Sequence, residues 1–111
     1  MQVPIFEILT WQSATGVTDN KMINTMNQFS KVVAKLPGFL YQSLYKNSEG
    51  QWICIYFWET EQEAHASNGI VAETKAFDDL MSIIQKDSVT IEVLSSLQDS
   101  GIVEFKPLKT N

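Results

Sequence analysis

The chain has 111 residues and a mass of 12.6 kDa, which favours one domain because a single core commonly occupies about 100–200 residues. Its 8 basic residues, all of them lysine, face 13 acidic ones and give a net charge of −5. Binding to nucleic acid or to anionic lipid needs clustered cations, so this charge argues against both partners. With 44% hydrophobic and 19% charged residues, the composition is that of an ordinary globular domain.

Cysteine and histidine each occur once, as Cys54 and His65. One cysteine cannot form an internal disulfide, and the two residues together do not supply the ligands of a zinc site. We therefore expect no metal. The N-terminal region has no basic segment before an apolar one, and no apolar run approaches the roughly 18 residues that span a bilayer. A cytoplasmic location is predicted.

The first half of the chain predicts a strand, a helix and a second strand. Residues 3–11 are mostly β-branched and aromatic, and a polar loop follows over residues 12–18. After Thr18 or Asp19, either of which can cap a helix, apolar residues recur every three or four positions. They are Met22, Met26, Phe29, Val33 and Leu36. Pro37 and Gly38 end this helix, and residues 39–46 form the next strand.

Residues 47–50 predict a four-residue hairpin loop, with Gly50 at the position that needs a positive φ. This loop places Lys46 opposite Gln51, Tyr45 opposite Trp52 and Tyr41 opposite Tyr56. One face of the hairpin is then aromatic and the other mainly aliphatic. The aromatic face holds Phe39, Tyr41, Tyr45, Trp52, Tyr56 and Trp58.

The second half predicts a helical region and a last strand. Thr60 and Glu63 have the spacing of a capping box, and Asn68-Gly69 can interrupt the helix that they begin. A further helical stretch covers residues 74–84 and a strand covers residues 88–96. The order matches a ferredoxin-like βαββαβ α+β fold: a four-stranded antiparallel sheet with helices on one face. We assign residues 1–98 to this domain. Residues 99–111 form a tail, either a short extra strand or a frayed end.

Helices on one side leave the other side of an apolar sheet uncovered. Either the aromatic or the aliphatic set of the central hairpin would be exposed in a monomer, and such a patch is rare on monomers. Packing of two sheets about a two-fold axis would bury it. The sequence therefore predicts a homodimer through the sheet faces.

Several short motifs also carry a resemblance. They are Leu36-Pro37-Gly38-Phe39, Gly50-x-Trp52, Trp58-Glu59-Thr60, Ala64 with Ala66, and Asp87-Ser88-Val89. Over about residues 3 to 96 the chain resembles the antibiotic biosynthesis monooxygenase (ABM)-like domains of the dimeric α+β barrel superfamily. The resemblance implies that fold. It also implies a family whose members include small oxygenases that oxidise quinol-like and polycyclic phenols without metal or flavin, haem-degrading proteins, and proteins without known activity.

The haem-degrading members carry an asparagine on the first strand, a tryptophan in the second helical region and a histidine further along. The first strand here reads Ile5-Phe-Glu-Ile-Leu-Thr10, and Asp78-Asp-Leu-Met81 stands where the histidine is expected. The resemblance therefore implies no haem, and we expect no cofactor.

A cofactor-free oxygenase needs a base and an apolar pocket. His65 is the best candidate base by its ordinary pKa, with an exposed helix histidine as the alternative. Glu7 on the first strand and Glu92 on the last are further candidates, because desolvation raises a carboxyl pKa; the alternative is an edge-strand charge. Tyr41 and Tyr56 are candidates to orient substrate oxygens, or else to fill an interface.

The substrate-binding candidates are apolar. Trp11, Trp52 and Trp58 can stack on an aromatic ligand, or else belong to the core and the dimer contact. Met26 and Phe29 can form a pocket wall, or else helical core.

Two functions follow. The first is a cofactor-independent monooxygenase acting on a small aromatic or quinol-like metabolite. The alternative is a non-catalytic dimeric domain of the same fold that binds a small apolar molecule or has a structural role. Convergent polar groups in the pocket would favour the enzyme, and a purely apolar cavity would favour the binding domain.

Overall fold

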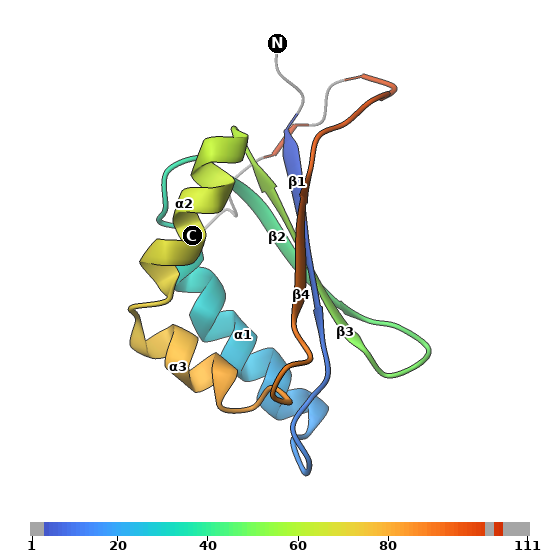
Figure 1. Cartoon of the computed structure of the whole chain (residues 1–111), viewed down its shortest axis with the longest axis vertical. Helices are drawn as coiled ribbons and strands as arrows, with labels where there is room; N and C mark the ends of the chain where they lie inside the picture. The colour runs from blue at the N-terminus through green and yellow to red at the C-terminus, as the bar shows by residue number, and fades with distance from the viewer. Residues whose placement is uncertain (1–3, 102–103, 106–111) are drawn as a thin grey trace, which may run out of the picture.

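The computed structural model describes residues 4–101, 104 and 105 and has the predicted order of elements. The elements are β1 (Ile5–Trp11), α1 (Asp19–Val33), β2 (Phe39–Lys46), β3 (Trp52–Trp58), α2 (Glu61–Val71), α3 (Lys75–Met81) and β4 (Thr90–Leu94). The strands form one antiparallel sheet in the order β2-β3-β1-β4. Figure 1 shows the three helices on one side of this sheet. The ferredoxin-like α+β fold is confirmed.

Each helix begins at a threonine whose hydroxyl accepts a backbone hydrogen bond, which satisfies one of the free N–H groups of the first turn. Thr18 accepts from the Lys21 N–H, Thr60 from the Glu63 N–H and Thr74 from the Phe77 N–H. Thr60 and Glu63 of the predicted capping box are in contact: beside the bond from the Glu63 N–H, the Thr60 hydroxyl donates to Glu63 Oε1 at 3.0 Å.

The second helical region breaks later than the sequence suggests. Asn68 and Gly69 lie inside α2, and the break falls after Val71, where Thr74 caps α3. Helix α1 ends at Val33 rather than Leu36, and the intervening residues form a turn before Gly38, whose φ is +82°.

The hairpin register differs from the prediction by one residue. Asn47 belongs to the paired part of the hairpin, because its N–H donates to the Gln51 carbonyl at 2.9 Å and its side chain accepts from the N–H groups of Glu49 and Gln51. The loop therefore has three residues and ends in Gly50, whose φ is +81° as expected. Lys46 lies opposite Trp52, not Gln51, so the predicted pairs Tyr45–Trp52 and Tyr41–Tyr56 are wrong.

The pairing of β2 with β3 is irregular between Phe39 and Tyr41, and this irregularity puts Phe39 on the inner face of the sheet. Phe39 pairs with Trp58 and Tyr41 pairs with Phe57, so Leu40 is an extra residue on β2. Phe39 therefore packs edge-on against Trp58, with ring centroids 5.9 Å apart, whereas Tyr41 contacts Phe57 on the opposite face.

The inner face of the sheet, toward the helices, forms the core. Alternate residues of β3 are buried there: Trp52, Cys54, Tyr56 and Trp58. They pack with Trp11 of β1 and with Met22, Met26, Phe29 and Val33 of α1. The predicted helical stripe thus faces the sheet.

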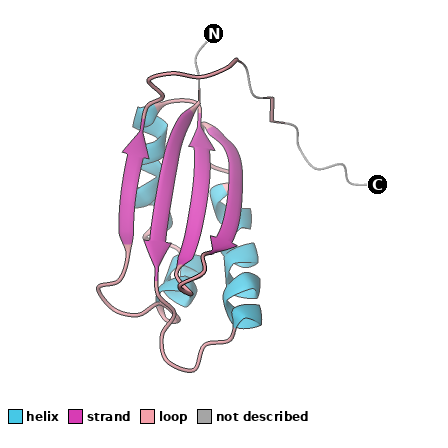
Figure 2. Ribbon diagram, turned by 90° about the vertical axis from the view of Figure 1, so that its right-hand side faces the viewer, coloured by secondary structure: helices cyan, strands magenta, loops and turns pink. Residues whose placement is uncertain are grey.

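The outer face carries Phe6, Ile53, Ile55 and Phe57, together with the exposed Tyr41 and Tyr45. Figure 2 looks onto this face, with the helices behind the sheet. The expectation that the tyrosines of β2 share a face with Trp52, Tyr56 and Trp58 is corrected, because the shorter loop turns β2 by one residue. The other alternative, an uncovered aliphatic set, describes the outer face of β3.

In the tail, the ring of Phe105 lies against Tyr41 and Phe57 on the outer face. The proposed extra strand at residues 101–105 falls partly on residues 102 and 103, outside the described part. No helix in residues 4–101, 104 and 105 has the length and apolar character needed to cross a membrane.

Candidate active site

A cavity of about 390 Å³ lies between the inner face of the sheet and the helices. Strand β1 contributes Glu7, Leu9 and Trp11, strand β3 contributes Cys54, Tyr56 and Trp58, and helix α1 contributes Met26, Phe29 and Val33. Helix α2 adds Ser67, Asn68 and Val71, and α3 with the segment into β4 adds Phe77, Leu80, Met81, Ile84, Val89 and Ile91. This volume is at the small end of ordinary ligand pockets, about 300–1,000 Å³.

Glu7 is the charged residue of this lining. It points to the inner face because it lies at an even spacing from Leu9 and Trp11 on β1, and it is only 2% exposed. Its Oε1 accepts a hydrogen bond from the indole N–H of Trp58 at 2.9 Å, while its Oε2 is buried without a hydrogen-bond partner among the described residues. A buried polar atom without a partner is costly, and a catalytic role is one of the reasons for which proteins keep one.

Burial raises the pKa of the Glu7 carboxyl above its ordinary value. The Trp58 indole, and more weakly the side chains of Asn68 and His65, lower the pKa of Glu7 without cancelling the effect of burial. A carboxyl whose pKa is raised in an apolar pocket can exchange a proton closer to neutral pH than an exposed one.

Trp58 is held in place from both sides. Phe39 packs on it edge-on, and the ring of Tyr56 stacks on it with centroids 6.1 Å apart. These contacts fix the indole N–H that supports Glu7. Burial also raises the pKa of Tyr56 well above its ordinary value. At neutral pH its phenol is therefore a neutral group.

Cys54 lies beside Tyr56 on the same face, and Gln42 Nε2 donates to its Sγ at 3.3 Å. Burial raises the pKa of the Cys54 thiol to about 11. The thiol stays protonated at neutral pH, so Cys54 packs as a small apolar residue and is a poor nucleophile.

The opening of the cavity lies along the edge made by β4 and the helices α2 and α3. Four lining residues are exposed there: Asn68, Met81, Val89 and Ile91. Asn68 is the polar one among them, and it acts on the pKa of Glu7. By sequence, Asn68 with Gly69 was expected to interrupt the helix. Its spacing of four from Ala64 and three from Val71, both buried, was the signal that it lies near the inner side of α2.

Six of the predicted site residues meet in this cavity: Glu7, Tyr56, Trp11, Trp58, Met26 and Phe29. The indole N–H of Trp11 is also buried, with no hydrogen-bond partner in the part of the chain that the structure describes. The fold thus places a candidate base, Glu7, in the same cavity as the aromatic side chains that were expected to contact the substrate.

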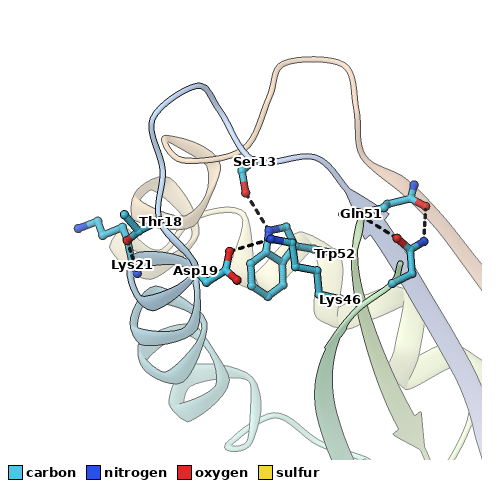
Figure 3. A network of polar contacts seen from close by, with 8 residues as sticks. Ser13, Thr18, Asp19, Lys21, Lys46, Gln51 and Trp52 are labelled. Carbon is cyan, nitrogen blue, oxygen red and sulfur yellow. Dashed lines mark hydrogen bonds and ion pairs between the residues drawn. The ribbon is translucent and has the colours of Figure 1, made fainter. Parts of the chain in front are cut away.

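Trp52, by contrast, lies outside the cavity lining. Its indole N–H donates to Ser13 Oγ at 2.8 Å, and the Lys46 ammonium lies 5.1 Å from its ring centre while pairing with Asp19 (Figure 3). These contacts close the end of the sheet near the hairpin. Trp52 therefore has a packing environment, not a ligand-facing one.

His65, Tyr41 and Glu92 also lie outside the lining. His65 is on the exposed side of α2, one residue past the buried Ala64, and its side chain is 58% exposed and 3.4 Å from Glu61. Tyr41 is on the outer face of the sheet. Glu92 is exposed on β4 and pairs with Ile8 on the outer face. The geometry offers none of the three to a ligand in this cavity.

The described residues include no group of three or more His, Cys, Asp or Glu side chains placed to hold a metal ion.

Known structures share this architecture. No protein-family model matches the sequence, and no curated protein matches it. SnoaB, a cofactor-independent oxygenase from Streptomyces nogalater, superposes with a TM-score of 0.72 over 87% of this chain and 96% of its own, at 9% identity. The monooxygenase from the gene ActVA-Orf6 of Streptomyces coelicolor, solved in complex with nanaomycin D, has a TM-score of 0.64 over 92% of this chain and 93% of its own, at 14% identity.

These similarities establish an ABM-like fold for the chain, as the sequence motifs indicated. At such low identity they do not extend to the reaction or the substrate.

Proposed function

We propose that the protein is a cofactor-independent monooxygenase that oxidises a small phenolic aromatic molecule in the cavity, with Glu7 as the base. The observation that carries this proposal is the Glu7 carboxylate, buried in an aromatic cavity with one oxygen fixed by Trp58 and the other unpartnered. Because burial raises its pKa, Glu7 is better matched to a weakly acidic phenol than an exposed carboxylate would be.

In the proposed reaction, Glu7 takes the proton of the substrate hydroxyl. The resulting phenolate gives electrons to O2, and a C–O bond forms at a ring carbon that carries hydrogen, which yields a hydroperoxide. The O–O bond then breaks with loss of water, and the ring becomes a quinone. One oxygen atom ends in the quinone and the other in water. The phenol loses the four electrons that O2 gains.

The names of the structural neighbours support this assignment, since one is described as a cofactor-independent oxygenase and another as a monooxygenase in complex with the ligand nanaomycin D. The alternative of a non-catalytic binding domain would be favoured by a cavity lined by apolar groups alone. A buried carboxylate favours the enzyme, because it is an expensive group to keep where binding needs only apolar contact.

Oxygen consumption tests the proposal. The purified protein would be given 1-naphthol and anthrone, with one quinone expected per O2 consumed. Glu7→Gln keeps the size of the side chain and an acceptor for Trp58 but removes the base, so we expect uptake to fall by about 100-fold or more. His65→Ala, on the exposed side of α2, is the matched control and should keep the activity.

Two results would contradict the proposal. One is uptake by the unaltered protein no faster than autoxidation with either compound. The other is full activity in Glu7→Gln.

We also propose that the protein is a homodimer that packs through the outer face of the sheet. Apolar side chains of this face are exposed, including Tyr41, Tyr45 and Leu94, and such patches mark interfaces. Light scattering at micromolar concentration should give about twice the mass of the chain, and a monomer would count against the dimer. The cytoplasmic location and the domain boundary at residue 98 stay predictions.

A further inference from the structure

We propose that the cavity selects uncharged aromatic ligands and excludes aromatic anions of the same size. This inference rests on the proposed function, because it concerns which phenols reach Glu7. It comes from the charges of the lining, which contains one acidic side chain, Glu7, and no lysine, arginine or histidine.

The absence of a cation holds for the whole lining, all of whose residues the structure describes. Three lining residues are ionisable: Glu7, Cys54 and Tyr56. Burial raises the pKa of the thiol and of the phenol, so both are neutral at pH 7. Three basic side chains on or beside the elements of the cavity have acidic partners outside the lining. His65, which acts on the pKa of Glu7, lies on the exposed side of α2, 3.4 Å from Glu61. Lys75 pairs with Asp79 on α3, and Lys46 pairs with Asp19.

A carboxylate, sulfate or phosphate on a ligand would have to leave water without gaining a counter-charge. An unpaired ion in an apolar site costs several kilocalories per mole even after relaxation, so affinity should fall steeply. When Glu7 is ionised, repulsion adds to this cost. When Glu7 is protonated, the desolvation cost is still present. The exclusion therefore does not depend on the protonation state of Glu7.

Two lining residues have a buried polar atom without a hydrogen-bond partner among the described residues: Glu7, whose Oε2 accepts, and Trp11, whose indole N–H donates. The indole is neutral, so it supplies no counter-charge for an anion. An uncharged phenol can donate to Oε2 of Glu7, while its rings contact Trp58, Phe29 and Leu80. The ligand that satisfies the site is thus apolar over most of its surface and carries a hydroxyl at one position.

A pair of probes that differ in charge but hardly in size tests the inference. Methyl 6-hydroxy-2-naphthoate is an uncharged ester, and 6-hydroxy-2-naphthoate, which lacks the methyl group, is a carboxylate anion at pH 7. Binding at pH 7 can be followed by quenching of tryptophan fluorescence, because Trp11 and Trp58 line the cavity. We expect the ester to bind on the order of 100-fold more tightly than the carboxylate.

Met81 allows the charge of the lining to be changed at the opening, since it is exposed there on α3. Met81→Lys supplies the missing cation, and Met81→Gln has similar length without charge. The ratio of the two dissociation constants should fall by about tenfold in Met81→Lys and stay near the original value in Met81→Gln.

The outcomes separate this inference from the proposed function. If the dissociation constants of the ester and the carboxylate differ by less than about threefold, the proposed charge selection is wrong, but the cavity still binds aromatic ligands. Tighter binding of 6-(aminomethyl)-2-naphthol, a cation at pH 7, than of the ester would overturn it as well, because Glu7 would then be recruiting cations. Failure of the ester to bind at all would overturn both proposals.

Discussion

The two faces of β3 are both apolar, yet they have different roles. Trp52, Cys54, Tyr56 and Trp58 alternate on the inner face and are all buried, whereas Ile53, Ile55 and Phe57 on the outer face are half-buried. The inner face needs aromatic residues with polar handles, because an indole N–H holds the Glu7 carboxylate there. The outer face has no such requirement. The proposed chemistry is thus confined to the inner face of the sheet, and the proposed dimer contact to the outer face.

The largest effect should come from removing the centre of the inner face. Trp58→Ala should lower the free energy of unfolding by about 3–5 kcal/mol, because it leaves a cavity beside Phe39, Tyr56 and Glu7. Ile53→Ala on the outer face is the comparison and should cost about 1–2 kcal/mol, since its side chain is less buried. Urea unfolding gives both values, and equal losses would remove the contrast between the faces.

A charge on the outer face should separate the proposed dimer. Ile55→Lys places an ammonium at the middle of this face, between Ser43 and Ile8. Light scattering should then show the mass of one chain. Ile23→Lys, at an exposed isoleucine of α1, is the matched control and should keep the mass of the unaltered protein. A dimer that survives Ile55→Lys would place the interface elsewhere.

The pH dependence of stability should report the protonation of Glu7 on the inner face. Because the pKa of Glu7 in the folded protein is above the value of 4.5 expected in the unfolded chain, the folded state binds the proton more tightly. The contribution of Glu7 to stability is therefore fully present below pH 4.5 and is lost as the pH rises through the raised pKa. The melting temperature should decline over this window in the unaltered protein, and less so in Glu7→Gln. Parallel curves would argue against a raised pKa.

The smallest effect concerns the turn that sets which side chains of β2 face inward. Gly50 has a φ of +81°, so Gly50→Ala should cost about 1 kcal/mol through backbone strain. Gly69→Ala is the control, because Gly69 is helical with open space around it and alanine favours a helix by up to about 1 kcal/mol. Thermal unfolding should move in opposite directions for the two variants.

The sequence predicted the fold better than the site. Thr18 and Thr60 are local signals, and each caps the start of a helix in the structure. The Pro37-Gly38 pair marks the turn before β2, although α1 itself ends earlier, at Val33. The hairpin register depended on whether Asn47 belongs to the strand or to the loop. That choice is made by two hydrogen bonds to its side chain, which residue spacing does not reveal.

Within the site, Glu7 was found because a carboxylate on an apolar strand is unusual. Trp11 and Trp58 were found because tryptophans can stack on an aromatic ligand. His65 was preferred as the base for its ordinary pKa, but its position around α2 decides its exposure, and that position depends on which side of the helix packs on the sheet. The neighbouring Ala64, 0% exposed, takes the inward place. Asn68 was missed for the same reason.

The extra residue Leu40 links the geometry of the hairpin to the cavity in a further way. It puts Phe39 on the inner face, where Phe39 packs on Trp58, which in turn donates to Glu7. If all residues of β2 alternated regularly, Phe39 would share the outer face with Tyr41 and could not pack on the indole. The irregularity at the start of β2 thus bears on the position of Glu7, although no residue of β2 lines the cavity.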